Sequence, residues 1–431
     1  MTLKIKNKKL WLGLAFTVLV LFVYRLGYYV QLPYISYDNV KQLSSDGTQM
    51  FGFLDIFSGG ALSNFSIVAL GVSPYITASI VVQLLQMDIV PILKEWSEEG
   101  ATGKEKLNSL TKYIAIGLGF VQALTLVVGV SVSYNDMFFA AGTDDLGMFK
   151  YIYLAIVMTA GTGFVLWLAD KVTKHGVGNG TSLFIVAGII ASFPEMINDL
   201  MQKYILAEEV TTGGIFIFIG VILLLLLIIV GIVFMEAAQR KIPIQYANRP
   251  SAATFRGKND SNIPIKLNSA SVIPVIFAST LMSLPLTIGN FINNANAQTW
   301  INNICSTSEP IGFALYIVLI YVFSFFYTFM QMNPQQMAEN LQKQNAYIPG
   351  IRPGDETAAY ISRVLFKITI VGATYLALVA ALPIIISGIF DLPASVSIGG
   401  TSLIIVVGVA IETAKQIKTA AQDKQYHGFM D

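Results

Sequence analysis

Long uncharged runs of apolar residues recur along the whole chain, and they limit its fold more than any other feature. Four of them, 113–135, 151–169, 210–235 and 368–390, reach the roughly 20 residues that a helix needs to cross a bilayer. Lipid offers the backbone no hydrogen-bond partners, so runs of this kind are expected to be helical. Of the 431 residues, 54% are hydrophobic and 12% are charged, about half the charged fraction of a typical soluble domain. The sequence predicts an all-α integral membrane protein.

Ten membrane spans are predicted from the spacing of these runs. We place them near residues 10–30, 74–87, 111–132, 150–169, 180–197, 213–235, 270–290, 311–331, 366–387 and 397–415. A short segment around 195–213 separates the fifth span from the sixth and divides the chain into an N-terminal half, 1–205, and a C-terminal half, 206–431. Each half holds five spans, an odd number. If the halves are structural repeats, they must be inserted in opposite orientations, as in many transporters.

The distribution of basic residues predicts the orientation of the spans. With the N-terminus inside, all but four of the 27 Lys and Arg residues fall on the cytoplasmic side. The four exceptions are Arg25, Lys41, Lys150 and Lys203. Cytoplasmic loops of membrane proteins carry an excess of Lys and Arg, so this orientation is favoured. Both termini are therefore expected in the cytoplasm.

The second uncharged run, 56–87, is interrupted by residues that disfavour helix. These interrupters are Gly59, Gly60, Gly71 and Pro74. The piece between them, 61–70, would rise only about 15 Å as a helix and cannot cross a hydrocarbon core of about 30 Å. Irregular backbone at membrane depth is tolerated only where protein or a water-filled cavity surrounds it. Two interpretations remain open: a segment that is re-entrant or packed inside the protein, or a kinked span with a ragged outer end.

Six collinear stretches carry a resemblance to a known family. They are FSGGALSNFSIVALGVSPYITASIVVQLL at 57–85, HGVGNGTSLFIVAGI at 175–189, EAAQRKIPIQYANR at 236–249, NSASVIPVIFAST at 268–280, NPQQMAENLQKQNAYIPGIRPG at 333–354 and GGTSLIIVVGVAIET at 399–413. In sequence and in order they resemble the SecY family, and with the ten spans the likeness covers essentially the whole chain. The resemblance implies two inverted five-helix halves around a central pore. It also implies a protein-conducting channel of the Sec translocase, which moves unfolded preproteins across the bacterial cytoplasmic membrane and releases membrane-protein helices laterally into lipid.

The resemblance to SecY implies a ring of isoleucines at the constriction of the pore. Aliphatic side chains suit a pore for arbitrary unfolded sequence, because fixed charges or specific hydrogen-bonding groups would trap some substrates. A hydrophobic constriction also resists wetting when it is empty and so limits ion leakage. The implied ring residues are Ile76, Ile80, Ile185, Ile189, Ile276 and Ile405.

The same resemblance implies a plug and a lateral gate. The plug, which blocks the outer funnel of the idle channel, would consist of Gly60, Ala61, Leu62, Ser63, Asn64, Phe65, Ser66, Ile67, Val68, Ala69 and Leu70. We expect this segment to pack weakly, as suits a part that must leave its seat. The second and seventh spans would form the gate toward lipid, where Gln83, Ser279 and Thr280 offer modest interhelical hydrogen bonds. An ordinary role as small or polar interface residues is equally open for each of these three.

Two loops on the cytoplasmic side are candidates for docking partners. The loop 236–267 is long and basic, and its basic residues include Arg240, Lys241, Arg249, Arg256 and Lys258. The loop 332–365 holds Arg352 between two Pro-Gly-type turns. Positive-inside topology explains some of this charge but not so long an exposed loop. In the SecY family these loops bind the ribosome and the motor ATPase SecA, and basic groups suit RNA phosphates and acidic protein faces. The resemblance further implies SecE and SecG as partner subunits.

Two other classes of function are considered. A secondary transporter also has inverted repeats and broken helices. Against a transporter, no clear Asp, Glu or Lys stands near the middle of a span, where proton-coupled carriers usually keep such groups. A non-transporting assembly scaffold is the other alternative. Neither class accounts for the six collinear stretches.

No sequence feature points to an enzyme or to a cofactor. The chain has no phosphate-binding G-x-x-x-x-G-K-[ST] loop and no evident nucleophile or metal constellation. A lone Cys305 excludes an internal disulfide, and neither His175 nor His427 has the neighbours that a metal site requires. We therefore expect no catalytic residue, no metal and no cofactor. Energy for transport is expected to come from partners or from the membrane potential.

Overall fold

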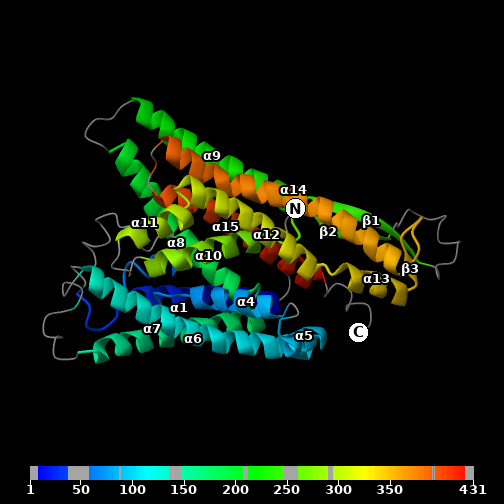
Figure 1. Ribbon diagram of the computed structural model, residues 1–431, viewed down its shortest axis with the longest axis horizontal. Coiled ribbons are helices and arrows are strands. Elements are labelled where there is room, and N and C mark those ends of the chain that lie inside the picture. The colour runs from blue at the N-terminus through cyan, green and yellow to red at the C-terminus, as the bar shows by residue number, and fades with distance from the viewer. Residues whose placement is uncertain are drawn as a thin grey trace.

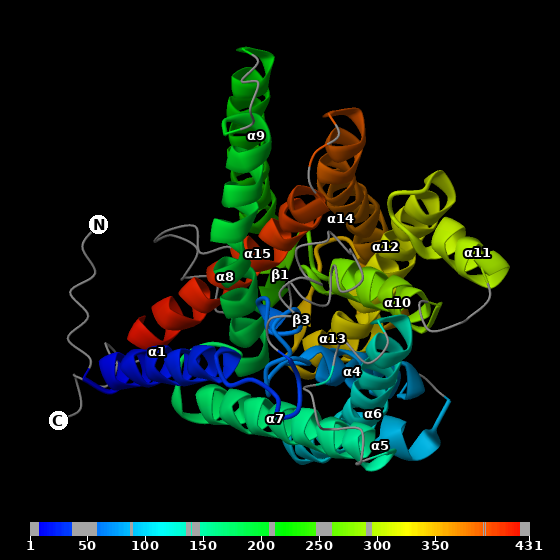
Figure 2. The ribbon, with the colours of Figure 1, turned by 90° about the vertical axis from the view of Figure 1, so that its left-hand side faces the viewer.

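The chain folds into an elongated bundle of tilted helices, seen from two directions in Figures 1 and 2. The computed structural model describes residues 8–36, 58–86, 89–134, 139, 147–206, 212–246, 261–289, 295–390, 392 and 394–422. Among these residues, ten helices coincide with the ten predicted spans. They are α1 (Lys8–Tyr28), α4 (Ser73–Leu85), α6 (Ala101–Tyr134), α7 (Phe149–His175), α8 (Gly180–Tyr204), α9 (Thr212–Ala237), α10 (Ile273–Gly289), α12 (Pro310–Gln331), α14 (Asp355–Phe390) and α15 (Ala394–Gln422).

Most of these helices are long enough to cross a membrane. In the described part of the chain, seven stretches combine sufficient length with sufficient apolarity. The helices α4 and α10 are shorter, with 13 and 17 residues. At 1.5 Å per residue α4 extends about 20 Å, less than the roughly 30 Å of a hydrocarbon core. Because α4 alone does not cross such a core, part of the irregular backbone that precedes it lies at the depth of the membrane.

In the described ranges, three further helices lie outside the predicted spans. They are α5 (Pro91–Glu98), α11 (Ala295–Cys305) and α13 (Pro334–Lys343). Both α5 and α13 have a proline in the first turn, where the missing N–H costs no helical hydrogen bond. The side chain of Asn333 caps α13 by accepting hydrogen bonds from the backbone N–H groups of Gln335 and Gln336.

A small antiparallel sheet joins the two long loops, and the sequence analysis did not predict it. It consists of β1 (Gln239–Tyr246), β2 (Ser261–Lys266) and β3 (Ala346–Tyr347) in the order β2-β1-β3. Ile242 and Ile244 on β1 are buried while the residues between and beside them are exposed, an alternation typical of a strand with one buried face. These two side chains pack with Ile265 of β2 and with α13 and the first turns of α14 in a separate hydrophobic cluster. Residues 236–246 and 261–267 thus fold together with the loop 332–365.

The helices form two groups in space. In Figure 1, α1 and α4 to α7 occupy the lower part of the molecule, α9 to α12 and α14 lie above them, and α13 lies at the right-hand end. The helix α8 packs on α7 and also on α15, and α15 packs on α9 and α14, so these two helices link the groups. A large hydrophobic cluster at the centre draws side chains from both groups.

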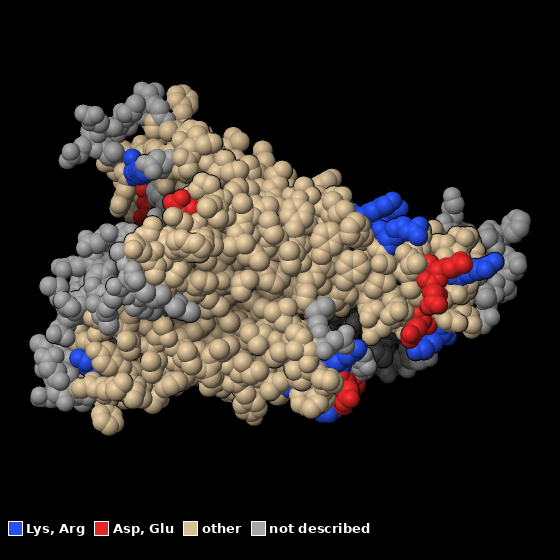
Figure 3. Space-filling model, in the orientation of Figure 1, with Lys and Arg blue, Asp and Glu red and all other residues tan. Residues whose placement is uncertain are grey.

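Charged side chains gather toward the ends of the molecule. On the face seen in Figure 3, a broad middle band is uncharged, and Lys and Arg are concentrated at the end that carries β1, β3 and α13. We call this the basic end. An uncharged band between charged ends is the surface that a membrane-spanning protein requires.

Candidate functional site

The six isoleucines predicted for the ring lie on four helices, and all six are buried. The helix α4 carries Ile76 and Ile80, α8 carries Ile185 and Ile189, α10 carries Ile276, and α15 carries Ile405. All belong to one hydrophobic cluster. Within each pair the residues lie four positions apart, so both face the same side of their helix. The fold therefore brings six aliphatic side chains from both groups of helices into one apolar region.

Residues 58–72, which we call the central segment, are packed inside the protein. The backbone runs through successive turns instead of a helix, and Ala61, Leu62, Ser66 and Ala69 are each at most 1% exposed. This burial confirms the first of the two interpretations of the interrupted run and excludes a kinked span. A span with a ragged end would expose much of its surface to lipid.

The central segment packs more tightly than its composition suggested. Ala61 and Val68 belong to the same cluster as the six isoleucines, and Leu62 and Phe65 belong to a second cluster formed with α6 and α7. The expectation of weak packing is wrong, because the few large side chains of the segment are all directed into these clusters. Full burial of one such side chain contributes about 1.5–3 kcal/mol.

Glycines on the surrounding helices allow this close approach. A Cβ atom added at Gly161 of α7 would lie 2.0 Å from the carbonyl oxygen of Ile67. A Cβ atom added at Gly27 of α1 would lie 3.1 Å from a methyl group of Val68. Since non-bonded carbon atoms prefer about 3.5–4.0 Å, the segment occupies space that only glycine leaves free at Gly161.

The three predicted gate residues behave differently from one another. Gln83 of α4 accepts a short hydrogen bond from the hydroxyl of Tyr327 on α12. Ser279 of α10 donates to the carbonyl of Val275 on its own helix, at 2.7 Å, and lies 3.3 Å from the hydroxyl of Tyr316 on α12. Thr280 donates only within its own helix, to the carbonyl of Ile276 at 2.8 Å. The interhelical bonds of this region therefore run to α12, and none of the three residues bonds α4 directly to α10.

Tyr316 and Tyr327 were missed by sequence reasoning. Both are at most 2% exposed, and Tyr327 also packs edge-to-face on Phe277 of α10 with ring centroids 4.9 Å apart. A buried tyrosine usually finds a partner for its hydroxyl. Tyrosines in a largely apolar span were thus a usable signal, although the sequence could not name their partners.

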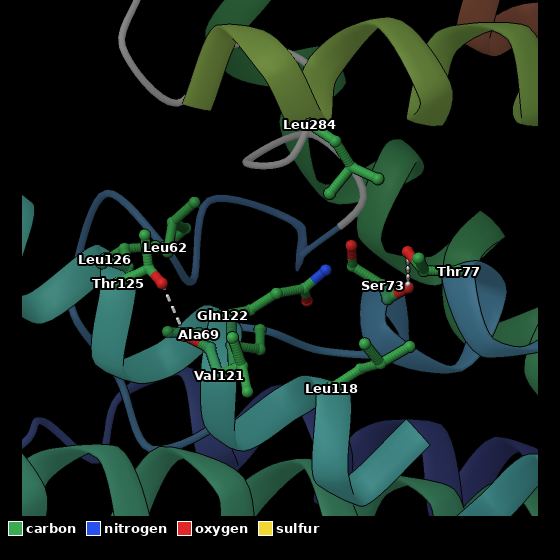
Figure 4. A pocket seen from close by; sticks show the side chains of 11 residues that line it. Leu62, Ala69, Ser73, Thr77, Leu118, Val121, Gln122, Thr125, Leu126 and Leu284 are labelled. Carbon is green, nitrogen blue, oxygen red and sulfur yellow. Dashed lines mark hydrogen bonds between the residues drawn. The ribbon is translucent and has the colours of Figure 1, made fainter. Parts of the chain in front are cut away.

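A cavity lies between α4, α6, α10 and the central segment. Its volume is about 200 Å³, and its walls are mostly apolar. Figure 4 shows Leu284 pointing into it from α10, with Leu62 and Leu118 on other sides and the Gln122 amide among them. The full lining is Leu62, Ala69, Leu70, Ser73, Thr77, Leu118, Val121, Gln122, Thr125, Leu126 and Leu284. The first turns of α4 and Leu284 of α10 thus border the cavity, while α4 and α10 also contact each other directly.

The basic end presents three of the six predicted docking residues. Arg240 and Lys241 are exposed on β1, and Arg352 is exposed on a turn that precedes α14. The hydroxyl of Thr357 donates to the carbonyl of Arg352 at 2.8 Å, and the flanking Gly350 and Gly354 have φ of +82° and +104°. These constraints hold the turn and direct Arg352 outward. The other three, Arg249, Arg256 and Lys258, lie outside the described residues.

The described residues hold no cluster of metal ligands. No group of three or more His, Cys, Asp or Glu side chains in that part of the chain is placed to hold a metal ion. The candidate site is thus an apolar region with a packed central segment and a basic end.

Comparison with known proteins identifies the family. The SecY family model matches residues 66–414. Protein translocase subunit SecY of Bacillus licheniformis is 44% identical over 427 residues, which cover 99% of this chain and 96% of that protein. The same subunit of Halalkalibacterium halodurans is 45% identical over 417 residues, 96% of this chain and 95% of that protein.

Solved structures share the fold. A structure described as a protein-conducting channel aligns with a TM-score of 0.63 at 19% identity, covering 97% of this chain and 94% of that one. A SecY structure whose plug domain is described as stabilising the closed state and maintaining a membrane seal aligns with a TM-score of 0.66 at 18% identity, with the same coverage of both chains. Sec61 from a canine ribosome-channel complex gives 0.62 at 17% identity, again with that coverage.

The family match and the shared fold agree with the uncharged band and the buried apolar region of this chain. The secondary-transporter alternative is not favoured. The chain belongs to the SecY family, and it is a translocase subunit that forms a protein-translocation channel and is not an enzyme.

Proposed function

We propose that the six isoleucines form the constriction of this channel and that residues 60–70 are its plug. The observation that carries the proposal is their shared burial: the isoleucines lie in one hydrophobic cluster with Ala61 and Val68 of the central segment. An apolar constriction excludes water and ions when it is empty and offers no fixed chemistry to trap a passing chain. A segment packed against that constriction supplements the seal.

In this proposal the N-terminal half, 1–205, and the C-terminal half, 206–431, part along α4 and α10 to form the lateral gate. The apolar cavity bordered by these helices supports the proposed gate. When the central segment moves, it exposes the apolar walls of this cavity, and an apolar segment of a substrate can then pack on them. The gate is held closed in part by the hydrogen bond between Gln83 and Tyr327. An apolar signal sequence or a membrane-protein helix would therefore compete for the same surfaces that close the channel.

We assign the basic end to the cytoplasm of a bacterial cell and place both termini on that side of the cytoplasmic membrane. The excess of Lys and Arg at this end supports the orientation. Arg352, Arg240 and Lys241 are exposed there and suit RNA phosphates or an acidic protein face. The proposed partners are the ribosome and SecA at this end, with SecE and SecG as membrane subunits. Solved neighbours of this fold include ribosome-bound channel complexes.

The proposal is tested with the chain co-purified with SecE and SecG homologues and reconstituted in vesicles. Added SecA and ATP should drive a signal-bearing preprotein into the vesicles, and the same preprotein without its signal should stay outside. Deletion of residues 60–70 should raise ion conductance in planar bilayers and relax signal selectivity while leaving assembly with the partner subunits unchanged. If the deletion variant conducts no more than the unaltered channel, residues 60–70 are not a principal seal.

A further inference from the structure

The last turn of α1 contacts the start of the central segment through an arginine. A guanidinium N–H of Arg25 donates to the carbonyl of Gly59 at 2.8 Å. The same guanidinium lies 4.1 Å from the centroid of the Tyr28 ring. A hydrogen bond from a charged donor is stronger than a neutral one, and the aromatic ring further stabilises and orients the cation. Arg25 is thus held by its own helix while it holds Gly59.

The backbone at Gly59 lies directly on α8. Gly59 has φ of +69°, a conformation that glycine adopts without strain. A Cβ atom added there would lie 2.8 Å from the Cα atom of Gly188. Gly188 falls between the ring residues Ile185 and Ile189 in the sequence of α8. The bond from Arg25 therefore fixes the start of the segment against a helix that supplies two of the six isoleucines.

Two further side chains reinforce this attachment. The hydroxyl of Tyr24 donates to the carbonyl of Ser58 at 3.3 Å. The Asn64 amide donates a short hydrogen bond to the Tyr28 hydroxyl and a second, of 3.2 Å, to the carbonyl of Gly60. Tyr28 therefore contacts both Arg25 and the middle of the segment.

The backbone that follows α1 pairs with the middle of the segment. The N–H of Leu32 donates to the carbonyl of Phe65 at 3.0 Å, and the N–H of Ile67 donates to the carbonyl of Val30 at 2.9 Å. These two bonds flank the antiparallel bridge between Gln31 and Ser66. The segment is thus attached to α1 and its continuation at its start and through its middle.

Resting on the proposed role of residues 60–70 as the plug, we propose that Arg25 is the positioning residue of that plug. Its bond to the Gly59 carbonyl holds the plug over the constriction in the idle channel, and this bond breaks when the plug leaves. Gly59 and Gly60 both have positive φ, and these two flexible residues would act as the hinge of the plug. The hinge thus begins at Gly59, the residue that Arg25 holds. Arg25 therefore sets the equilibrium between the plug held over the constriction and the displaced plug.

The test measures resting ion conductance and export of a reporter with a defective signal sequence, using the complex with its partner subunits. Arg25→Gln removes the charged donor and should shift the equilibrium toward the displaced plug by roughly ten-fold or more. Both readouts should rise. Arg25→Lys keeps a charged donor and should restore part of the closed behaviour, which a merely structural role of the guanidinium would not predict.

Deletion of residues 60–70 separates this inference from the proposed function. In the deletion background Arg25→Gln should add nothing, because the group that it positions is gone. If the deletion raises conductance but Arg25→Gln in the full chain does not, the positioning role is wrong and the plug assignment stands. An equal rise from Arg25→Gln with and without the plug also overturns the positioning role. If the deletion leaves conductance unchanged, the plug assignment fails first and the role of Arg25 fails with it.

A second measurement does not depend on the stability of the Arg25 variants. Gln31 and Ser66 form a pair without mutual hydrogen bonds, whose Cα atoms are typically about 4.5 Å apart, within the range for a disulfide. In a Cys305→Ser background, Gln31→Cys with Ser66→Cys should block preprotein translocation when oxidised and regain it in reductant. Full translocation with the disulfide closed would show that the plug need not leave α1, against the proposal.

Discussion

The Tyr327 hydroxyl on α12 donates a hydrogen bond to the side-chain carbonyl of Gln83 on α4, and the two residues are 244 positions apart in the chain. This bond joins the two groups of helices near the C-terminal end of α4. Gln83 is further oriented by donating to the Ser79 hydroxyl at 3.0 Å. The closed gate thus has a specific polar contact that opening must break.

Replacing Tyr327 with Phe should therefore make the gate easier to open. One net hydrogen bond contributes about 0.5–1.5 kcal/mol, so the equilibrium should shift by about two- to ten-fold toward the open state. Export of a signal-defective reporter measures the shift. Tyr316→Phe is a matched control on the same helix, because the Tyr316 hydroxyl lies 3.3 Å from the hydroxyl of Ser279 on α10, which belongs to the same group of helices. Equal export from the two variants would mean that the bond to Gln83 does not hold the gate.

Replacing Ile405 with Asn tests the constriction. The change puts a hydrogen-bonding amide into the buried cluster, which favours wetting and weakens the apolar packing of the closed state. Burial of an aliphatic side chain contributes about 1.5–3 kcal/mol, enough to shift a balanced equilibrium about ten-fold or more. Resting conductance and export of the signal-defective reporter should both rise.

The control for Ile405 must come from outside the central cluster. Ile228 on α9 is unsuitable, because it is 2% exposed and belongs to the same cluster. Ile219 on the same helix is 54% exposed and gives a matched Ile→Asn change at the surface. If Ile219→Asn raises export as much as Ile405→Asn, the effect does not come from a constriction.

Replacing Gly161 with Ala should displace the plug without changing a plug residue. The added methyl group would lie 2.0 Å from the Ile67 carbonyl oxygen, and overpacking of this kind costs about 1–3 kcal/mol. Since part of that cost is relieved when the segment moves, the resting conductance should rise. Gly163→Ala on the same helix is the control, because nothing lies within 4 Å of its Cβ position. If both variants conduct no more than the unaltered channel, the contact between Gly161 and Ile67 does not control the position of the plug.

Replacing Arg352 with Glu should abolish most SecA-dependent translocation while membrane insertion and assembly with partner subunits continue. The side chain is exposed at the basic end and takes no part in a hydrophobic cluster, so the fold should tolerate the change. Lys343→Glu is the control, because it makes the same change of charge on α13, where the Lys343 Nζ atom lies 3.9 Å from Oε2 of Glu339. Translocation into vesicles by each variant decides the matter: a normal rate for Arg352→Glu would exclude it as the contact.

Local sequence patterns predicted the spans with good boundaries. The eighth span, placed at 311–331, coincides with α12 (Pro310–Gln331), and the fifth, placed to begin at 180, begins there as α8. The ninth span was predicted from 366, yet α14 begins at Asp355. Hydropathy detects the part of a helix that suits lipid, whereas a helix with acidic residues in its first turn can begin in water.

Contacts between distant residues could not be predicted in this way. The short strands β1 and β2 carry basic residues and proline, and their pairing depends on a hydrophobic cluster that includes α13 and α14. The partners of Gln83, Arg25 and Gly161 lie on other elements, and no local periodicity encodes them.

The sequence by itself determined that this chain spans a membrane, where its spans lie, and that the run before α4 is interrupted, because apolarity and helix interruption are local properties. The resemblance of six stretches added the family. Only the tertiary structure decided that the interrupted run is packed at the centre of the bundle, that six isoleucines from four helices share one cluster, and that Arg25 holds Gly59. These relationships arise from packing between elements far apart in sequence, where each side chain contacts what the fold as a whole places beside it.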